Sequence, residues 1–313
     1  MQGLKISRQY YEEYGEPMLR EQFPEILPYL AAGLCGSGSE CFGFDDEISR
    51  DHDFEPGFCL FLPDESIVDR KTAFALERAY AKLPKEYKGL TRLTLQPVGG
   101  SRHGVQRTGE FFLSKTGSPD GKMTAQQWLA IPSSALAEAV NGEIFFDGYG
   151  EVTRIRERLA FYPEDIRRKK LAGRLLLMAQ AGQYNFSRCL AHGETGAAQL
   201  AVHEFAVNAI DAVFLLNKRY APFHKWAFRA MKELPELGYT APLLEYLLTS
   251  DNQPENTEGK TRVIEGIASD IITVLTRDSL SEAVCGDLEK HAYSVNDGIA
   301  DAGLRNMHIL AGV

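Results

Sequence analysis

The chain has 313 residues, enough for one large or two ordinary domains, and its 44% hydrophobic content can form a substantial core. Its 43 acidic and 34 basic side chains give a formal net charge of −9, which argues against a general nucleic-acid-binding protein, because such proteins carry a basic surface. The sequence has no run of about 18 apolar residues that would predict a membrane span, and its N-terminal segment has no signal-peptide core, so we expect a cytoplasmic protein. The five cysteines lack Cys-x-x-Cys spacing, and we expect them to be reduced, mostly buried thiols.

The first half of the chain mixes helical and strand patterns. Residues 4–14 have a helical pattern that ends near Gly15, and the apolar runs at 30–35 and 58–62 predict strands. Further along we expect a helix at 64–83, a strand at 90–98, loops around a short aromatic element (110–113) within 99–121, short helices at 124–130 and 133–140, and a strand at 143–147.

Strand patterns disappear from Gly150 onward. The expected helices there are 151–161, 163–182, 196–219, 223–233, 240–249, 259–276 and 280–293. The sequence therefore predicts an α+β fold, with a small mixed-sheet domain at 1–150 followed by an all-helical bundle at 151–313.

The most informative stretch lies between the first two expected strands and reads GSGSECFGFDDEISRDHD. Asp51 and Asp53 alternate at a strand start, so both carboxylates point to the same face. Such hard oxygen ligands suit Mg²⁺ (or Mn²⁺), with substrate phosphates completing the coordination. A glycine at position 38 lets the backbone approach a phosphate, and Ser39 adds a hydroxyl. The stretch predicts a site for phosphoryl or nucleotidyl transfer.

The same stretch resembles the signature of the DNA polymerase β-type nucleotidyltransferase superfamily. That signature is a Gly-Ser pair, a glycine four residues after the serine, and an Asp-x-Asp about a dozen residues after it. The matching residues are Gly38, Ser39, Gly43, Asp51 and Asp53, with one residue more than the commonest spacing before the acids. The alternative pair, Gly36 and Ser37, fits less well because no glycine follows Ser37 at the right distance.

The sequence around this motif resembles that of uncharacterised bacterial nucleotidyltransferase-like proteins, and the resemblance extends over most of the chain. The resemblance implies a Mg²⁺-dependent enzyme that moves NMP from an NTP, with ATP the expected NTP, to an acceptor. It also implies a helical second domain like that of kanamycin-type nucleotidyltransferases. Asp51 and Asp53 would hold the metal, and Gly38, Ser39, Gly43 and, less favoured, Ser37 would bind the nucleotide.

For the other candidate site residues, the sequence allows either a functional or a purely structural role. The superfamily carries a third carboxylate on a later strand, but the expected strand at 90–98 has none, so Glu110 and Asp147 are substitutes; a turn role is favoured for Asp147. Lys218, Tyr220 and Lys225 flank a helix break, and related helical domains place such residues over the nucleotide. Charge at a helix end is an equal alternative.

Two polar groups in the helical half complete the candidates. Eight basic residues lie between 154 and 174, and a solvated helix face is favoured over a triphosphate-binding role for most of them. Glu204, Asn208 and Asp211 follow i, i+4, i+7 spacing and share a helix face. They could bind the acceptor or supply a general base, although a satisfied buried network is favoured.

Three functions remain open on the sequence. A nucleotidyltransferase is favoured, with a small molecule or a protein as the acceptor. The absence of an obvious third acid gives some weight to a non-catalytic nucleotide sensor or interaction protein on the same fold. A metal-dependent phosphohydrolase built on the dyad His52-Asp53 is disfavoured, because the dyad follows a Gly/Ser loop. We expect neither a membrane nor general nucleic acid as a partner.

Overall fold

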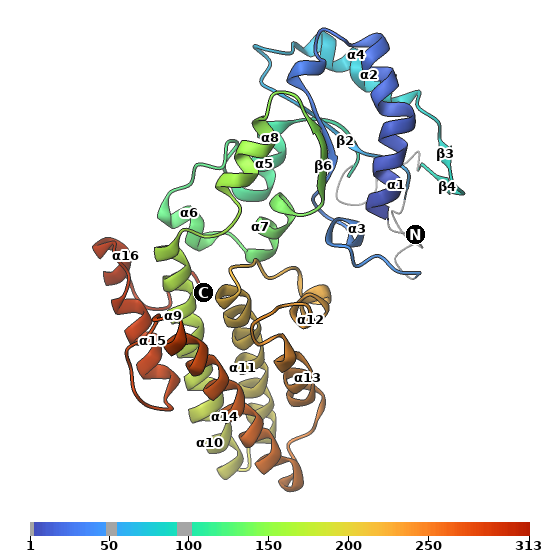
Figure 1. Ribbon diagram of the computed structural model, residues 1–313. Coiled ribbons are helices and arrows are strands. Elements are labelled where there is room, and N and C mark those ends of the chain that lie inside the picture. The colour runs from blue at the N-terminus through green and yellow to red at the C-terminus, as the bar shows by residue number, and fades with distance from the viewer. Residues whose placement is uncertain (1–2, 48–54, 93–101) are drawn as a thin grey trace. The chain divides into compact units, whose positions relative to one another are not determined.

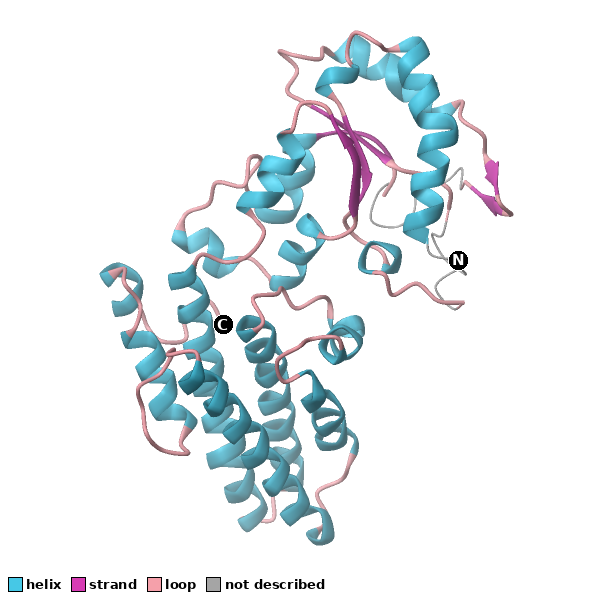
Figure 2. Ribbon diagram, viewed as in Figure 1, coloured by secondary structure: helices cyan, strands magenta, loops and turns pink. Residues whose placement is uncertain are grey.

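A computed structural model describes residues 3–47, 55–92 and 102–313. Contacts divide the chain into two compact units, the first formed by Met1–Met123 with Pro132–Ala160 and the second by Thr124–Ile131 with Phe161–Val313. The fold is α+β, as expected, and all the described strands belong to the first unit (Figure 2). The helix α8 (Glu151–Arg158), which follows the expected boundary at residue 150, belongs to the first unit.

The first unit begins with a continuous helical run. It consists of α1 (Gly3–Tyr10), a π-helical turn η1 (Tyr11–Gly15) and α2 (Glu16–Gln22). The sequence predicted a helix end at Gly15, but Gly15 has helical backbone angles and the run continues through it. A Cβ at this position would collide with the ring of Phe58, so the glycine allows close packing on the sheet rather than ending the helix.

A mixed sheet that includes β2 and β6 forms the centre of the first unit (Figure 1). It has four strands in the order β5-β2-β1-β6. β1 (Ala31–Leu34), reached through the 3₁₀ turn η2 (Leu27–Tyr29), pairs antiparallel with β2 (Cys59–Leu62) and with β6 (Glu143–Asp147). The three strands predicted at 30–35, 58–62 and 143–147 are therefore confirmed, and the first two are neighbours.

The fourth strand of the sheet was not predicted. β5 (Gly104–Arg107) pairs parallel with β2 in a segment that was expected to be loops. Of the strand predicted at 90–98, Leu90–Thr91 forms β4 and pairs with β3 (Glu86–Tyr87) in a separate two-stranded sheet, and the part from 93 onward lies outside the described residues. A strand of four half-buried residues at a sheet edge has too short a pattern to identify from sequence.

Helices cover both faces of the sheet. Alternate residues, such as Ala32 and Leu60, pack into one core with α1, α2 and α4 (Arg70–Ala81). On the other face, the ring of Phe61 packs against Phe111 of α5 (Thr108–Thr116), with ring centroids 5.3 Å apart. α5 packs in turn against α7 (Ser133–Val140), and α8 packs against β6. Because the faces are covered, a ligand site on this sheet belongs at its strand ends.

The second unit is helical throughout. A long run formed by α9 (Glu164–Met178), the π-helical turn η4 (Ala179–Asn185) and α10 (Phe186–Ala191) packs against α11 (Thr195–Leu216), and α9 also packs against α15 (Leu288–Asp297). The other elements are α6 (Ala125–Ala130), α12 (His224–Lys232), η5 (Gly238–Thr240), α13 (Ala241–Thr249), α14 (Pro254–Arg277) and α16 (Ala302–Asn306). The expected helix at 280–293 starts late, at Leu288, after a capping aspartate at position 287.

The segment 124–131 belongs to the second unit because of specific contacts. Trp128 packs edge-on against Tyr162, with centroids 5.8 Å apart. The buried ammonium of Lys170 donates to the carbonyls of Leu129 (2.8 Å) and Gly312 (2.9 Å). These contacts join the segment to α9 and to the C-terminal residues.

Among the described residues, α11 alone is long and apolar enough to span a membrane by length and composition. Of its most apolar 18-residue segment, 67% is buried inside the protein. Such burial is typical of a core helix.

The five cysteines are all free, and Cys35, Cys41 and Cys59 are buried. Burial raises the pKa of Cys35 to about 11, and it also raises the pKa of Cys41 and Cys59. Since these three side chains stay protonated near neutral pH, they act as small apolar core residues. Three of the five thiols are thus buried, in agreement with the prediction that most of them are.

Candidate functional site

Several strand ends meet at one end of the sheet in the first unit. β1 ends at Leu34, and Glu143 at the start of β6 lies beside it. At the start of β2, Cys59 pairs with Gly33 of β1 on one side and with Gly104, the first residue of β5, on the other. The turn after β1 and the segments that precede β2, β5 and β6 therefore share this end of the sheet. We call it the Gly-Ser edge, and the side chains that build it are those of Ser37, Ser39, Glu40, Glu55, Arg102, His103, Lys115, Glu138 and Asn141.

The Gly-Ser turn itself is fixed by Asn141. The backbone N–H of Gly36 donates to Oδ1 of Asn141, and Nδ2 of Asn141 donates back to the carbonyl of Gly36, both at 2.8 Å. Gly36 and Gly38 have φ angles of 107° and 128°, a region that favours glycine. Gly38 precedes the short helix α3 (Ser39–Phe42), and Gly43, in the left-handed conformation, ends it.

The two serines of the turn have different surroundings. Ser37 is exposed, and its hydroxyl donates to Glu138 (3.0 Å) and accepts from Lys115 (3.2 Å); Lys115 and Glu138 also form an ion pair. Ser39 is half-buried at the start of α3, and its hydroxyl makes no hydrogen bond with any other residue that the structure describes. Of the two hydroxyls, that of Ser39 is the better placed to bind a ligand.

An arginine lies directly against the turn. Nη1 of Arg102 is 3.1 Å from Oε1 of the buried Glu40 and donates to the carbonyl of Ser37 at 3.3 Å. A Cβ on Gly38 would collide with this guanidinium, so the glycine leaves room for it. With Lys115 it gives two cations at the turn. Neither cation was predicted from the sequence, because both are far from the motif along the chain and only the fold brings them to it.

A second polar pair lies at the same edge. Nδ1 of His103 is 3.2 Å from Oε1 of Glu55, and these side chains are only 7% and 16% exposed. Together with Glu40 they line a small cavity whose remaining wall comes from α1, β1 and Leu90. Glu55 is the first described residue after Asp51 and Asp53, which both lie outside the described residues.

The described carboxylates of the edge do not form a metal site by themselves. Glu40 is paired with Arg102, Glu55 with His103, and Glu138 with Lys115. Across the described ranges, no three His, Cys, Asp or Glu side chains gather in a way that could hold a metal ion. A metal at this edge would depend on further carboxylates, and oxygen donors of the Asp type fit Mg²⁺.

The two substitutes for a third carboxylate are not brought to the Gly-Ser edge by any described contact. Asp147 pairs with Ala31, at the opposite end of β1 from the turn. Its carboxylate accepts from the backbone N–H groups of Gly150 and Thr153, both at 2.8 Å, and so stabilises the start of α8. Glu110 is exposed in the first turn of α5.

The expected nucleotide-binding residues of the helical half lie in the second unit. Tyr220 is buried between Phe161 and Tyr162, with centroid distances of 5.2 and 4.9 Å, so its ring is a packing residue there. Burial and the neighbouring Tyr162 raise the pKa of Tyr220 well above its ordinary value. Lys218 is exposed, and the exposed Lys225 places its ammonium 4.3 Å from the ring centroid of Trp226.

The polar stripe on α11 forms an internal network. Arg174 of α9 donates to Oδ1 of the buried Asn208 and pairs with Oδ2 of Asp211, both at 2.9 Å. Nδ2 of Asn208 donates to the backbone carbonyl and to the carboxylate of Glu204. Burial raises the pKa of Asp211, and Arg174 opposes this shift. These contacts fit the buried-network interpretation rather than an open acceptor site.

Each of the eight basic residues between 154 and 174 has a hydrogen-bonding partner within its own unit. Their partners are backbone carbonyls, carboxylates of neighbouring residues or the α11 network. The residues are Arg154, Arg156, Arg158, Arg167, Arg168, Lys169, Lys170 and Arg174. This cluster is therefore explained by structural contacts, without a triphosphate.

Comparison with known proteins adds one match. Residues 128–227 match a family described as a domain of unknown function (DUF4037), which is less than half of the chain. The matched range runs from within α6 to within α12 and excludes the Gly-Ser turn. The chain gives no match among curated proteins.

Proposed function

We propose that the protein is a cytoplasmic Mg²⁺-dependent nucleotidyltransferase, with the NTP bound at the Gly-Ser edge. The observation that carries the proposal is the Gly-Ser turn, where the hydroxyl of Ser39 and the cations Arg102 and Lys115 lie together at strand ends. Glycines that let the backbone come close, a hydroxyl and basic side chains are features that can bind a triphosphate.

The residues of the sequence motif and the two cations of the edge have separate roles in the proposal. Gly38 and Ser39 bind the phosphates, and Gly43 ends the short helix that presents them. Arg102 and Lys115 balance the negative charge of the triphosphate. Asp51 and Asp53 hold the metal, and this assignment rests on the sequence motif. When bound, Mg²⁺ stabilises charge on the attacking and leaving oxygens.

Titration of a fluorescent ATP analogue, with and without Mg²⁺, tests the proposal. In Asp51→Asn and Asp53→Asn we expect Mg²⁺-dependent binding to be lost while the circular dichroism spectrum is unchanged. Glu47→Gln is the matched control, since Glu47 is exposed and precedes the motif aspartates by only a few residues. Unchanged ATP binding in both aspartate variants would reject the proposed site.

One observation favours a second candidate, a non-catalytic nucleotide sensor on the same fold. Asp147 caps α8 and Glu110 is exposed on α5, so neither proposed third carboxylate is joined to the Gly-Ser edge by a described contact. A sensor would bind the ATP analogue with Mg²⁺ but would release no AMP or pyrophosphate over long incubation. Release of pyrophosphate that is abolished by Asp51→Asn would favour the enzyme.

A further inference from the structure

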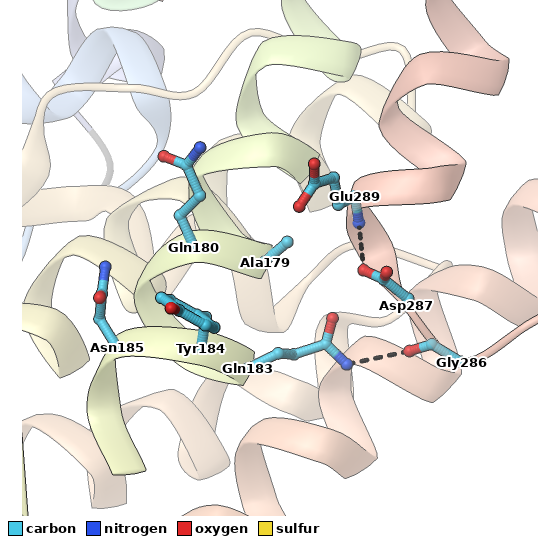
Figure 3. A pocket seen from close by; sticks show the side chains of 8 residues that line it. All are labelled: Ala179, Gln180, Gln183, Tyr184, Asn185, Gly286, Asp287 and Glu289. Atoms are coloured by element: carbon cyan, nitrogen blue, oxygen red, sulfur yellow. Dashed lines mark hydrogen bonds between the residues drawn. The ribbon is translucent and has the colours of Figure 1, made fainter. Parts of the chain in front are cut away.

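The second unit contains a pocket of about 550 Å³ that the proposed function does not use. One wall is the π-helical turn η4, which contributes Gln180, Tyr184 and Asn185. The facing wall is the chain that enters α15, with Asp287 and Glu289 (Figure 3). The volume lies in the range of small-molecule sites, about 300–1,000 Å³.

A glycine in the π-helical turn packs closely against two other helices. Gly182 lies in the middle of η4, and a Cβ there would collide with the ring of Phe205 and come within 2.8 Å of Ile264. The turn is therefore pressed against α11 and α14 on its glycine side, and its polar residues lie toward the pocket. Single π-helical turns inside α-helices occur frequently at functional sites.

Gln183 holds the two walls together. Its Nε2 donates to the carbonyl of Gly286 (2.9 Å) and to Oε2 of Glu265 (2.8 Å), and its Oε1 accepts from the backbone N–H of Leu288 (2.9 Å). The first of these bonds is drawn in Figure 3. Because the amide of Gln183 makes hydrogen bonds that connect the two walls, the pocket is formed without a ligand.

The lining is rich in hydrogen-bond acceptors, and none of the described residues that form it is basic. Oδ1 of Asp287 accepts from the N–H of Glu289, which caps α15, and leaves the second oxygen of Asp287 without a described partner. The carboxylate of Glu289 and the amide of Gln180 also make no hydrogen bond within the described part of the chain. A complementary ligand donates hydrogen bonds and carries positive charge.

An exposed aromatic ring adds to this preference. Tyr184 is 58% exposed at the pocket, and the guanidinium of Arg188 already lies 5.0 Å from its ring centroid. The ring thus accepts a cation in the free protein, as expected for an aromatic face.

We propose that this pocket binds a small organic polycation of the polyamine class, with its ammonium groups on Asp287 and Glu289 and its chain against Tyr184. The site is separate from the Gly-Ser edge, so the proposal does not depend on the proposed function.

Isothermal titration of the full-length protein with spermidine tests the proposal. The decisive variant is Asp287→Asn/Glu289→Gln, in which asparagine preserves the helix cap and glutamine preserves the side-chain length. We expect the double variant to bind spermidine at least about tenfold more weakly, which corresponds to about 1.4 kcal/mol. Added salt should weaken binding by the wild-type protein.

The control variant removes the same charge elsewhere in the second unit. Glu233→Gln/Glu255→Gln changes two exposed carboxylates outside the pocket and should leave the affinity within about twofold of the wild type, since the pocket charges are unchanged. Equal weakening in both double variants, or no saturable binding by the wild type, would overturn the proposal. Equally tight binding of trehalose, a neutral polyol, would also overturn it. Titration with the ATP analogue separates the two proposals, because the pocket variants should bind it normally.

Discussion

Ser37 and Ser39 are two residues apart and have the same side chain, yet the fold gives their hydroxyls different hydrogen-bonding surroundings. The sequence motif favoured Ser39 by spacing alone. The contacts of Ser37 with Glu138 and Lys115 support the same choice, because its hydroxyl already joins α5 to α7 through these two side chains. The assignment of Ser39 to a nucleotide remains a prediction.

The two serine variants should therefore separate binding from stability. We expect Ser39→Ala to weaken Mg²⁺-dependent binding of the ATP analogue by about 1–3 kcal/mol, the range for a hydrogen bond to a charged group. Ser37→Ala should lower the free energy of unfolding by about 0.5–1.5 kcal/mol and leave binding nearly unchanged. Fluorescence titration and urea unfolding measure the two effects, and weaker binding in Ser37→Ala alone would reverse the assignment.

Lys170 gives a pH dependence whose sign follows from its burial. Desolvation and the neighbouring Arg174 lower the pKa of Lys170 from 10.5 to about 8, while Asp211 opposes the shift. Between these two values the unfolded chain binds more protons than the folded protein, so this group makes the protein more stable as pH rises. The buried cysteines act in the opposite direction above their ordinary pKa of 9.0.

A comparison of variants isolates the contribution of this lysine. Between about pH 7.5 and about pH 9.5, the free energy of unfolding should change less in the stabilising direction in Lys170→Met than in the wild type, because the variant lacks this group. The cysteines are unchanged in both proteins, so their effect cancels. Urea unfolding followed by tryptophan fluorescence measures the difference; the same pH dependence in both proteins would contradict the assigned pKa direction.

At the scale of elements, the strongly patterned segments were predictable and the irregular ones were not. The predicted strand at 143–147 matches β6, and most of the helical half was found because apolar residues recur with helical spacing. β5 was missed because it has four residues and takes its pairing from a distant strand. The π-helical turns were missed for another reason: each departs from the α-helical pattern for only a single turn, which the spacing of apolar residues does not reveal.

The candidate site was predictable only in part, and for the same reason. Local spacing predicted Gly38 and Ser39 as candidates, but no local pattern brings Arg102 or Lys115 to the turn that contains them. The same absence of long-range information made Tyr220 a candidate for stacking on a base, whereas its neighbours Phe161 and Tyr162 bury it.

The glycine of η4 provides a test at the element scale. Gly182→Ala gains about 0.5–1 kcal/mol of helix-forming tendency, but overpacking against Phe205 and Ile264 costs about 1–3 kcal/mol. We therefore expect net destabilisation in urea unfolding. Gly266→Ala in α14 is the matched control, because its new methyl group meets no atom within 4 Å and should stabilise the protein. Stabilisation by both substitutions would show that the close approach at Gly182 is not required.

At the scale of the whole molecule, the units are not simple consecutive halves of the sequence. The chain contributes 124–131 to the second unit and then returns to the first with α7, β6 and α8. A boundary at residue 150 follows the change in composition, from mixed to helical patterns. That boundary does not account for the segment 124–131, which the hydrogen bond of Lys170 and the packing of Trp128 on Tyr162 join to the second unit.

The two tryptophans, Trp128 and Trp226, make this organisation measurable, because both belong to the second unit. In a Trp226→Phe background the remaining fluorescence comes from Trp128, while labelling of the buried thiols Cys35 and Cys59 follows the core of the first unit. Since Gly182 packs in the second unit, Gly182→Ala should lower the urea midpoint reported by Trp128. Thiol labelling should shift less, because the substitution leaves the first core intact. If the Trp128 midpoint stayed constant together with the thiol midpoint, the segment 124–131 would have to be assigned to the first unit.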